Sequence, residues 1–159
     1  MSVVASFPKQ GAVLWAVDVE LEKDVFRSGA ATKANVDYLR FVDLGMGEEG
    51  RIPAERAGIL TIAPGKGISL FLERMIPEGM VVLDAKDAET VSKKLQKKVH
   101  WWGIDQKQPI PDGLVLIYDG QPPGHCTLTV TREMTITGFL QLVALVTFSL
   151  KGIDLCIPK

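Results

Sequence analysis

Two side chains in this sequence have the chemistry of a reactive site, and each stands on a short segment of strand-like composition. His125 follows a glycine and opens the alternating segment 125–131. A histidine at the mouth of a strand can bind a sugar hydroxyl or shuttle a proton near neutral pH. Ser69 lies in the apolar segment 68–72, where its hydroxyl could contact a cofactor. The structural alternatives are an edge histidine bonded to a carbonyl and a serine that is simply polar on a strand face.

The spacing of the possible metal ligands gives little support to metal chemistry. Two cysteines and two histidines could in principle hold zinc, but no short pair such as C-x2-C or H-x3-H is present. We therefore expect no metal site. Two cysteines also exclude a disulfide scaffold, and the composition suits a reducing compartment. The four residues are His100, His125, Cys126 and Cys156, of which Cys126 is expected to be a small core residue.

Established catalytic motifs are missing. The segment 67–71 lacks the second glycine of the G-x-S-x-G elbow of α/β-hydrolases. The glycine-lysine-glycine run at 65–67 is too short for a P-loop, and we expect a hairpin turn there, with a backbone nest for an anion as the alternative. The pair Trp101 and Trp102 could stack a base or a nicotinamide ring, although core packing of one ring is the favoured interpretation.

Apolar periodicity predicts an α+β fold with several short, mostly antiparallel strands and a few short helices. Alternation within 125–131 places Cys126, Leu128 and Val130 on a core face and His125 on the other face. Helices are expected at 20–28, 32–44, 88–98 and 136–147. Strands are expected at 12–19, 59–62, 68–72, 80–83, 99–104, 114–118 and 125–131.

The ends of these elements carry further signals. Thr135 is a candidate N-cap for the last helix, and the lysines at the end of the 88–98 helix complement its dipole. Residues 45–58 are charged and rich in glycine and proline, so we predict a surface loop that could act as a lid or face a partner. The tail 151–159 is expected to be loosely attached.

Composition and charge exclude several classes of protein. The 159 residues suit one domain spanning 1–159, and 47% hydrophobic residues exclude wholesale disorder. A net charge of −1 gives no global attraction to DNA or anionic lipid. No secretory signal is visible at the N-terminus, and the most apolar stretch, 139–150, is too short to span a bilayer. We expect a soluble protein with no DNA partner and no membrane insertion.

Several short motifs occur in an order that resembles a known family. An opening Leu-Trp-Ala-Val strand is followed by a G-I-S-L-F strand, an I-P-D-G-L turn, a His-Cys-Thr strand and a methionine that opens the closing helix. They occupy 14–17, 67–71, 110–114, 125–127 and Met134, with Asp119 ending the strand after the turn. In this order and rough spacing the chain resembles the ADP-ribosyltransferase-like toxins delivered by bacterial type VI secretion systems.

The resemblance implies a compact sheet-built fold with a cleft for nicotinamide adenine dinucleotide (NAD), which is cleaved or used for ADP-ribosyl transfer. It places Ser69 and His125 at catalytic positions, and Trp15, Ser69, Phe71 and His125 along the NAD cleft. It also implies an effector that is cytoplasmic in its producer and reaches the target-cell cytoplasm without a cleaved signal peptide. A cognate immunity protein is the implied partner, with the lysines of 93–98 as its candidate docking site. A secretion-system component is a second possible partner.

Three positions depart from the family pattern and keep two other functions open. Trp15 stands where the family has an arginine that grips the dinucleotide, Ile68 replaces a threonine, and Cys126 replaces a tyrosine. No obvious glutamate stands near the motif strands. The alternatives are a catalytically inert binding module of the same fold and a small ribonuclease toxin that uses His100 and His125 as acid and base.

Overall fold

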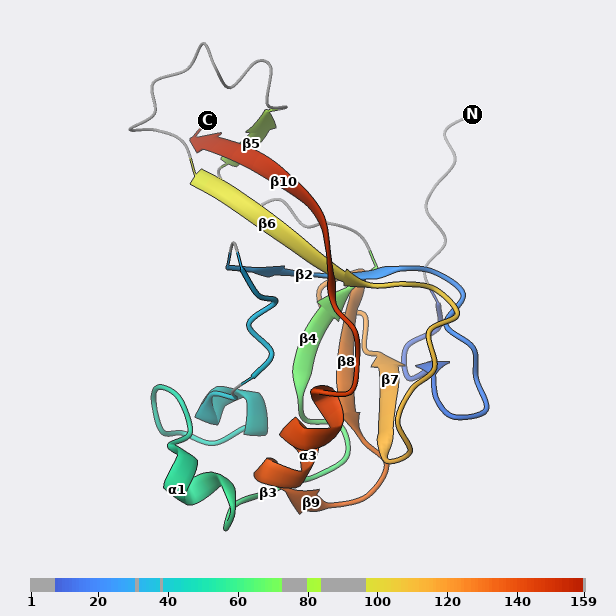
Figure 1. The fold of residues 1–159 in the computed structure, drawn as a ribbon, viewed down its shortest axis with the longest axis vertical. Helices are drawn as coiled ribbons and strands as arrows, with labels where there is room; N and C mark the ends of the chain where they lie inside the picture. The colour runs from blue at the N-terminus through green and yellow to red at the C-terminus, as the bar shows by residue number, and fades with distance from the viewer. Residues whose placement is uncertain (1–7, 31, 38, 73–79, 84–96, 159) are drawn as a thin grey trace.

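The fold is built from strands, with a few short helices at one end (Figure 1). The computed structural model describes residues 8–30, 32–37, 39–72, 80–83 and 97–158. The elements are β1 (Val13–Trp15), β2 (Val25–Gly29), the 3-10 helix η1 (Phe41–Leu44), α1 (Ala54–Ala57), β3 (Thr61–Ile62), β4 (Ile68–Phe71), β5 (Met80–Leu83), β6 (Lys97–Ile104), β7 (Leu114–Tyr118), β8 (His125–Val130), β9 (Met134–Thr135), α3 (Ile136–Val143) and β10 (Ser149–Pro158). The predicted α+β class with mostly antiparallel strands is confirmed.

One large sheet contains eight of the strands, in the order β1-β7-β8-β4-β2-β6-β10-β5, and β3 pairs with β9 in a small second sheet. Every strand pair within the described residues is antiparallel. The large sheet bends sharply between β4 and β2, which share the single register pair Phe26–Phe71. In Figure 1, β2, β6 and β10 run across the direction of β4, β8 and β7. We call β1-β7-β8-β4 the site limb and β2-β6-β10-β5 the crossing limb.

The site limb buries one face of its strands in the hydrophobic core. Cross-strand partners such as Leu70 and Cys126, or Leu116 and Leu128, lie side by side on this face and are buried. Helix α3 belongs to the same core, to which it contributes Ile136, Phe139 and Val143. Its N-terminus is capped as predicted, because Thr135 Oγ1 accepts a hydrogen bond from the Gly138 N–H at 3.1 Å.

Most strands of the site limb match the sequence prediction closely. The strands predicted at 68–72, 114–118 and 125–131 correspond to β4, β7 and β8 within one residue at each end. The strand predicted at 80–83 corresponds to β5 in the crossing limb. The strand predicted at 12–19 is confined to β1, because the chain turns back on itself through backbone hydrogen bonds between Ala16 and Val19.

Two predicted helices in the first part of the chain are wrong. The last four residues of the helix predicted at 20–28 belong instead to β2, because β2 pairs with β6 over five residues and this pairing outweighs the local helix preference. Of the helix predicted at 32–44, the residues that the structure describes form helix only in η1. As expected, Gly45 ends this element, with a left-handed φ of 73° that suits glycine. The predicted loop 45–58 contains α1 near its end.

The predictions for the last part of the chain also need correction. The tail expected to be loosely attached forms β10, which pairs with β6 on one side and β5 on the other. Lys97 and Lys98, predicted as the end of a helix, belong to β6; the rest of that prediction, 88–96, lies outside the described residues. Within the part of the chain that the structure describes, no helix has the length and apolar character to cross a membrane.

Candidate active site

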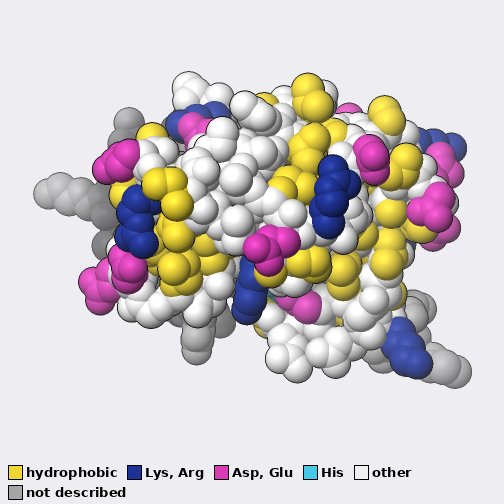
Figure 2. Space-filling model, turned by 90° about the horizontal axis from the view of Figure 1, so that it is seen from below, with side chains coloured by type: hydrophobic (Ala, Val, Ile, Leu, Met, Phe, Trp, Pro, Cys, Tyr) yellow, Lys and Arg dark blue, Asp and Glu magenta, His cyan; other side chains and the backbone are white. Residues whose placement is uncertain are grey.

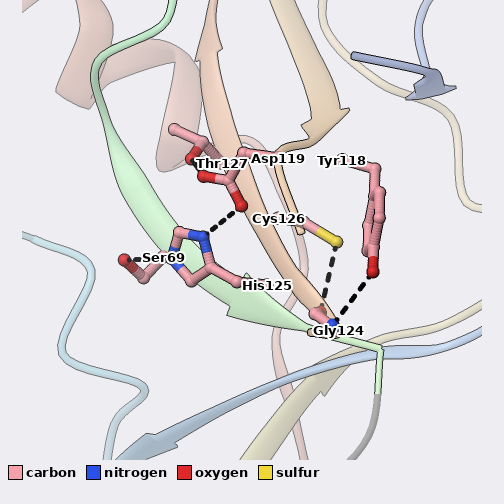
Figure 3. A network of polar contacts seen from close by, with 7 residues as sticks. All are labelled: Ser69, Tyr118, Asp119, Gly124, His125, Cys126 and Thr127. Atoms are coloured by element: carbon pink, nitrogen blue, oxygen red, sulfur yellow. Dashed lines mark hydrogen bonds and ion pairs between the residues drawn. The ribbon is translucent and has the colours of Figure 1, made fainter. Parts of the chain in front are cut away.

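Ser69 and His125 are in direct contact on the face of the site limb that points away from the core (Figure 3). His125 Nε2 lies 2.9 Å from Ser69 Oγ, and His125 Nδ1 lies 2.5 Å from Asp119 Oδ1. An ionised carboxylate can only accept hydrogen bonds, so Nδ1 carries a hydrogen and donates a hydrogen bond to Asp119. In this tautomer of the neutral ring, Nε2 accepts a hydrogen bond from the Ser69 hydroxyl. The structure brings together the two residues singled out from the sequence and adds a carboxylate.

Strand register explains why these side chains meet. Phe71 pairs with His125 and Ser69 pairs with Thr127 across the β4–β8 ladder, so all four side chains point to the same face. Ser69 is the diagonal neighbour of His125, a separation that long side chains bridge. The ring of Phe71 meets the imidazole edge-on, with centroids 5.2 Å apart and an interplanar angle of 69°. The aromatic contact and the ladder together fix the orientation of the imidazole.

Asp119 is itself held by a second side chain. Thr127 Oγ1 donates a hydrogen bond of 3.0 Å to Asp119 Oδ2, while Oδ1 accepts from His125. The Asp119 backbone N–H also donates to the His125 carbonyl at 3.2 Å. Both carboxylate oxygens are therefore engaged, although the Asp119 side chain is 39% exposed and that of His125 only 15%. This arrangement orients His125 in the way an orienting carboxylate does in acid–base sites.

The residue next to His125 faces the core and is inert. Burial raises the pKa of the Cys126 thiol to about 12, with the charge of Asp119 as a smaller cause. The protonated thiol points to the Gly124 carbonyl at 3.6 Å, and Tyr118 Oη accepts from the Gly124 N–H at 3.1 Å. These contacts hold the start of β8 in place (Figure 3). Cys126 is thus the core residue that the alternation predicted.

Sequence reasoning missed Arg27, which ties the site to the crossing limb. Its Nη1 donates to the Ser69 carbonyl at 2.9 Å. Its Nε and Nη2 donate to the carbonyls of Ala34 and Asn35 at 3.1 and 3.2 Å. Arg27 therefore links β2, β4 and the 34–35 segment just beyond the single β4–β2 pair. No sequence signal pointed to it, because it fell within a predicted helix. Asp119 carried a weak signal, as a carboxylate between a strand and the His125 strand.

Trp15 is not part of this group, although it was expected along the NAD cleft. It is 1% exposed and belongs to the core, on the same sheet face as its register partner Leu116. Its Nε1 donates to the Gln108 carbonyl at 2.7 Å. Trp15 therefore lies on the opposite face of the sheet from Ser69 and His125. Phe71, also expected along the cleft, lies beside His125.

The two histidines lie on different limbs. His100 pairs with Gly29 on β6, and the sheet order places β4 and β2 between β6 and the His125 strand. Three strand spacings of about 4.8 Å each separate β6 from β8. The register also puts His100 and His125 on opposite faces of the sheet. The pair that a two-histidine ribonuclease would need is not assembled.

The remaining sequence candidates have structural roles. The Gly65 N–H donates to Thr129 Oγ1 at 2.9 Å and the Lys66 N–H to the Ala63 carbonyl at 3.2 Å, so these donors of the candidate anion nest are occupied. Trp101 is 4% exposed, whereas the half-buried Trp102 donates from Nε1 to a backbone carbonyl. Among the described side chains, no group of three or more histidines, cysteines, aspartates or glutamates could hold a metal ion.

Two cavities lie away from the Ser69–His125 pair. One of about 600 Å³ lies between α1 and α3 and is lined by Leu39, Ile52 and Leu140 among others. Another of about 360 Å³ lies beside Val13 and Leu72. At the end of the molecule that carries α1, β3 and β9, apolar side chains are interspersed with charges of both signs (Figure 2). That end is not a basic surface of the kind that nucleic acids bind.

Comparison with known families gives one finding. A family model described as the Tse2 ADP-ribosyltransferase toxin matches residues 52–147. The match covers more than half of the chain, and it contains Ser69, Asp119 and His125. No curated protein and no solved structure matches the chain.

Proposed function

Because the chain belongs to the Tse2 ADP-ribosyltransferase toxin family of type VI secretion effectors, we propose that it is a toxin enzyme with NAD as its substrate. It cleaves NAD or transfers its ADP-ribosyl group, with Ser69 and His125 as catalytic residues. The observation that carries this proposal is the chain of hydrogen bonds from Ser69 through His125 to Asp119, which lies within the matched region.

The side chains on this face suit a nicotinamide nucleoside. Phe71 and His125 form a half-buried aromatic pair beside Ser69, against which a planar group can pack. The Ser69 oxygen, whose proton is engaged by His125, can accept a hydrogen bond from an amide. NAD supplies a ribose carbon bonded to a positively charged nicotinamide, which is the bond that breaks. Asp119 places a negative charge one imidazole ring away from Ser69, and a fixed negative charge favours the positive charge that develops on the ribose.

The same site supports a second candidate, an inert binding module of the same fold. Arg27 is the guanidinium bonded to the Ser69 backbone, and it donates to three backbone carbonyls. A guanidinium used in this way is committed to the fold rather than presented to a phosphate. Trp15, which stands in place of the family's arginine, is buried in the core. These two observations favour binding without turnover.

Family membership also supports proposals about partners and place of action. We infer that the protein acts in the cytoplasm of a target cell, that a cognate immunity protein neutralises it, and that a secretion-system component carries it. The sequence predicted a helix that presents the lysines of 93–98 to an acidic partner. Lys97 and Lys98 belong to strand β6 instead, so we do not propose this helix as a docking site.

Growth and NAD level in one bacterial host separate the two candidates. We expect induction of the parent chain to arrest growth and deplete cellular NAD, whereas Ser69→Ala and His125→Ala, shown by circular dichroism to be folded, do neither. Ser28→Ala is the matched control, because Ser28 is an exposed serine on β2, and it should behave like the parent. Arrest without loss of NAD, together with binding of labelled NAD by the purified chain, would favour the inert module.

A further inference from the structure

The Ser69–His125–Asp119 group has the parts of an activated nucleophile. A hydroxyl must contact a base, the base must contact a group that fixes its tautomer, and the hydroxyl must be reachable. Ser69 Oγ lies 2.9 Å from His125 Nε2, and His125 Nδ1 lies 2.5 Å from Asp119. Ser69 and His125 are half-buried rather than enclosed. We propose that Ser69 is a covalent nucleophile that reacts with activated acyl and phosphonyl compounds, without any need for NAD.

Two contacts make the base rigid. Thr127 holds the second oxygen of Asp119 at 3.0 Å, so the carboxylate keeps its orientation toward His125 Nδ1. Phe71 packs edge-on against the imidazole at 5.2 Å between centroids, which fixes the ring about its own axis. A base held in this way loses little conformational freedom when it accepts the proton, which is the advantage of a preorganised site.

The covalent step uses only groups of this chain and the electrophile. Ser69 Oγ attacks the carbonyl carbon of an activated ester, and its proton passes to His125 Nε2. The bond from the acyl carbon to the leaving oxygen breaks, and the departing alcohol takes the proton back from His125. Asp119 keeps its hydrogen bond to Nδ1 throughout and stabilises the imidazolium. Water then cleaves the acyl-serine by the same steps.

Strand geometry sets the direction of the one backbone donor that Ser69 itself offers to the oxygen anion formed during attack. The Ser69 carbonyl accepts from Arg27 on the β2 side. The N–H and C=O of one strand residue point to the same side, so the Ser69 N–H also points toward β2, beyond the single β4–β2 pair. One donor stabilises the anion less than the pair found in serine proteases. We therefore expect Ser69 to be modified stoichiometrically and released slowly.

A fluorophosphonate reagent tests this proposal on the purified full chain in the absence of NAD. Attack by Ser69 forms an Oγ–P bond, breaks the P–F bond and releases fluoride and the Ser69 proton. We expect one label per chain, mapped to Ser69 by peptide mass spectrometry, and none with Ser69→Ala. His125→Ala should slow labelling about 100-fold, the scale of general-base catalysis. Ser28→Ala, the exposed-serine control, should label like the parent.

Asp119→Asn separates activation from simple packing. An asparagine keeps the size of Asp119 but can donate its amide N–H to His125 Nδ1, which forces the proton onto Nε2 and removes the acceptor for Ser69. We expect labelling to slow at least roughly tenfold in a folded protein. Labelling at another serine, no labelling of the parent, or equal rates in the parent and in folded His125→Ala would overturn the proposal.

The labelling experiment and the NAD assay test the two proposals separately. Labelling of Ser69 by a chain that leaves NAD intact supports the nucleophile alone. Consumption of NAD by a chain that resists the reagent overturns the nucleophile and keeps the proposed function, with Ser69 acting only as a binding residue.

Discussion

The two limbs of the sheet differ in what their residues must do. In the site limb, the first four residues of β8 alternate, with Cys126 and Leu128 in the core and His125 and Thr127 on the reactive face. In the crossing limb, β10 has ten residues and is held by partners on both sides. The chemistry lies on β4 and β8, which bury one face in the core and carry Ser69, His125 and Thr127 on the other. A strand of this kind fixes a catalytic side chain through the packing of its neighbours.

Within the site limb, a substitution at the close approach of Gly67 to β8 should cause the largest loss of stability. A Cβ on Gly67 would lie 2.0 Å from the Leu128 carbonyl oxygen, a backbone atom that cannot move aside. Gly67→Ala should therefore lower the free energy of unfolding by about 3 kcal/mol or more. Urea unfolding measures this change. Gly47→Ala, whose Cβ would meet nothing within 4 Å, is the matched control, and equal stability of the two variants would refute the close approach.

Removing the hydrogen bonds that connect the two limbs should cause the next largest loss of stability. Arg27→Met removes three hydrogen bonds to the carbonyls of Ser69, Ala34 and Asn35 while keeping an apolar stem. We expect a loss of about 2 kcal/mol, because hydrogen bonds from charged donors contribute more than neutral ones. Thermal unfolding checks the loss, and amide exchange at β4 should increase with it. Arg27→Lys should fall between the parent and Arg27→Met; full stability of Arg27→Met would show that the limbs need no such connection.

The smallest effect concerns the buried face of the site limb. The pKa of Cys126 is raised from 9.0 to about 12 in the folded protein, so the unfolded chain loses this proton first as the pH rises. The stabilisation by the protonated thiol is complete well below pH 9 and is lost as the pH rises toward 12. The loss is about 0.4 kcal/mol at pH 9. In unfolding measured from pH 7 to 10, the difference in stability between the parent and Cys126→Ala should change along this slope.

The same contrast between the limbs explains what could be predicted from the sequence. Strands β4, β7 and β8 follow from alternation and from short turns, and Ser69 and His125 follow from their place on such strands. Strand β2 carries a charge, a serine and a glycine in five residues and becomes a strand only through its partner β6. Long-range pairing of this kind leaves little local trace.

The residues of the candidate active site also differ in how far the sequence could predict them. Ser69 and His125 are strand residues whose direction is set by a period of two. Asp119 lies in the connection after β7, and Arg27 acts through backbone carbonyls of three segments. Their roles depend on how the chain returns in space, which residue spacing does not encode. The single β4–β2 pair likewise follows from the bend of the sheet.

The place of β10 between β6 and β5 has a consequence for the order in which the newly made chain folds. Hairpin β7–β8 joins residues that leave the ribosome close together, such as Tyr118 and Cys126. Gly103 of β6, by contrast, can form its pair with Ser149 of β10 only after that distant residue has been synthesised. Contacts between distant residues form slowly, and until they form the edge of β6 toward β10 is bare and open to pairing with other chains. The site limb can therefore assemble while the crossing limb still lacks β10.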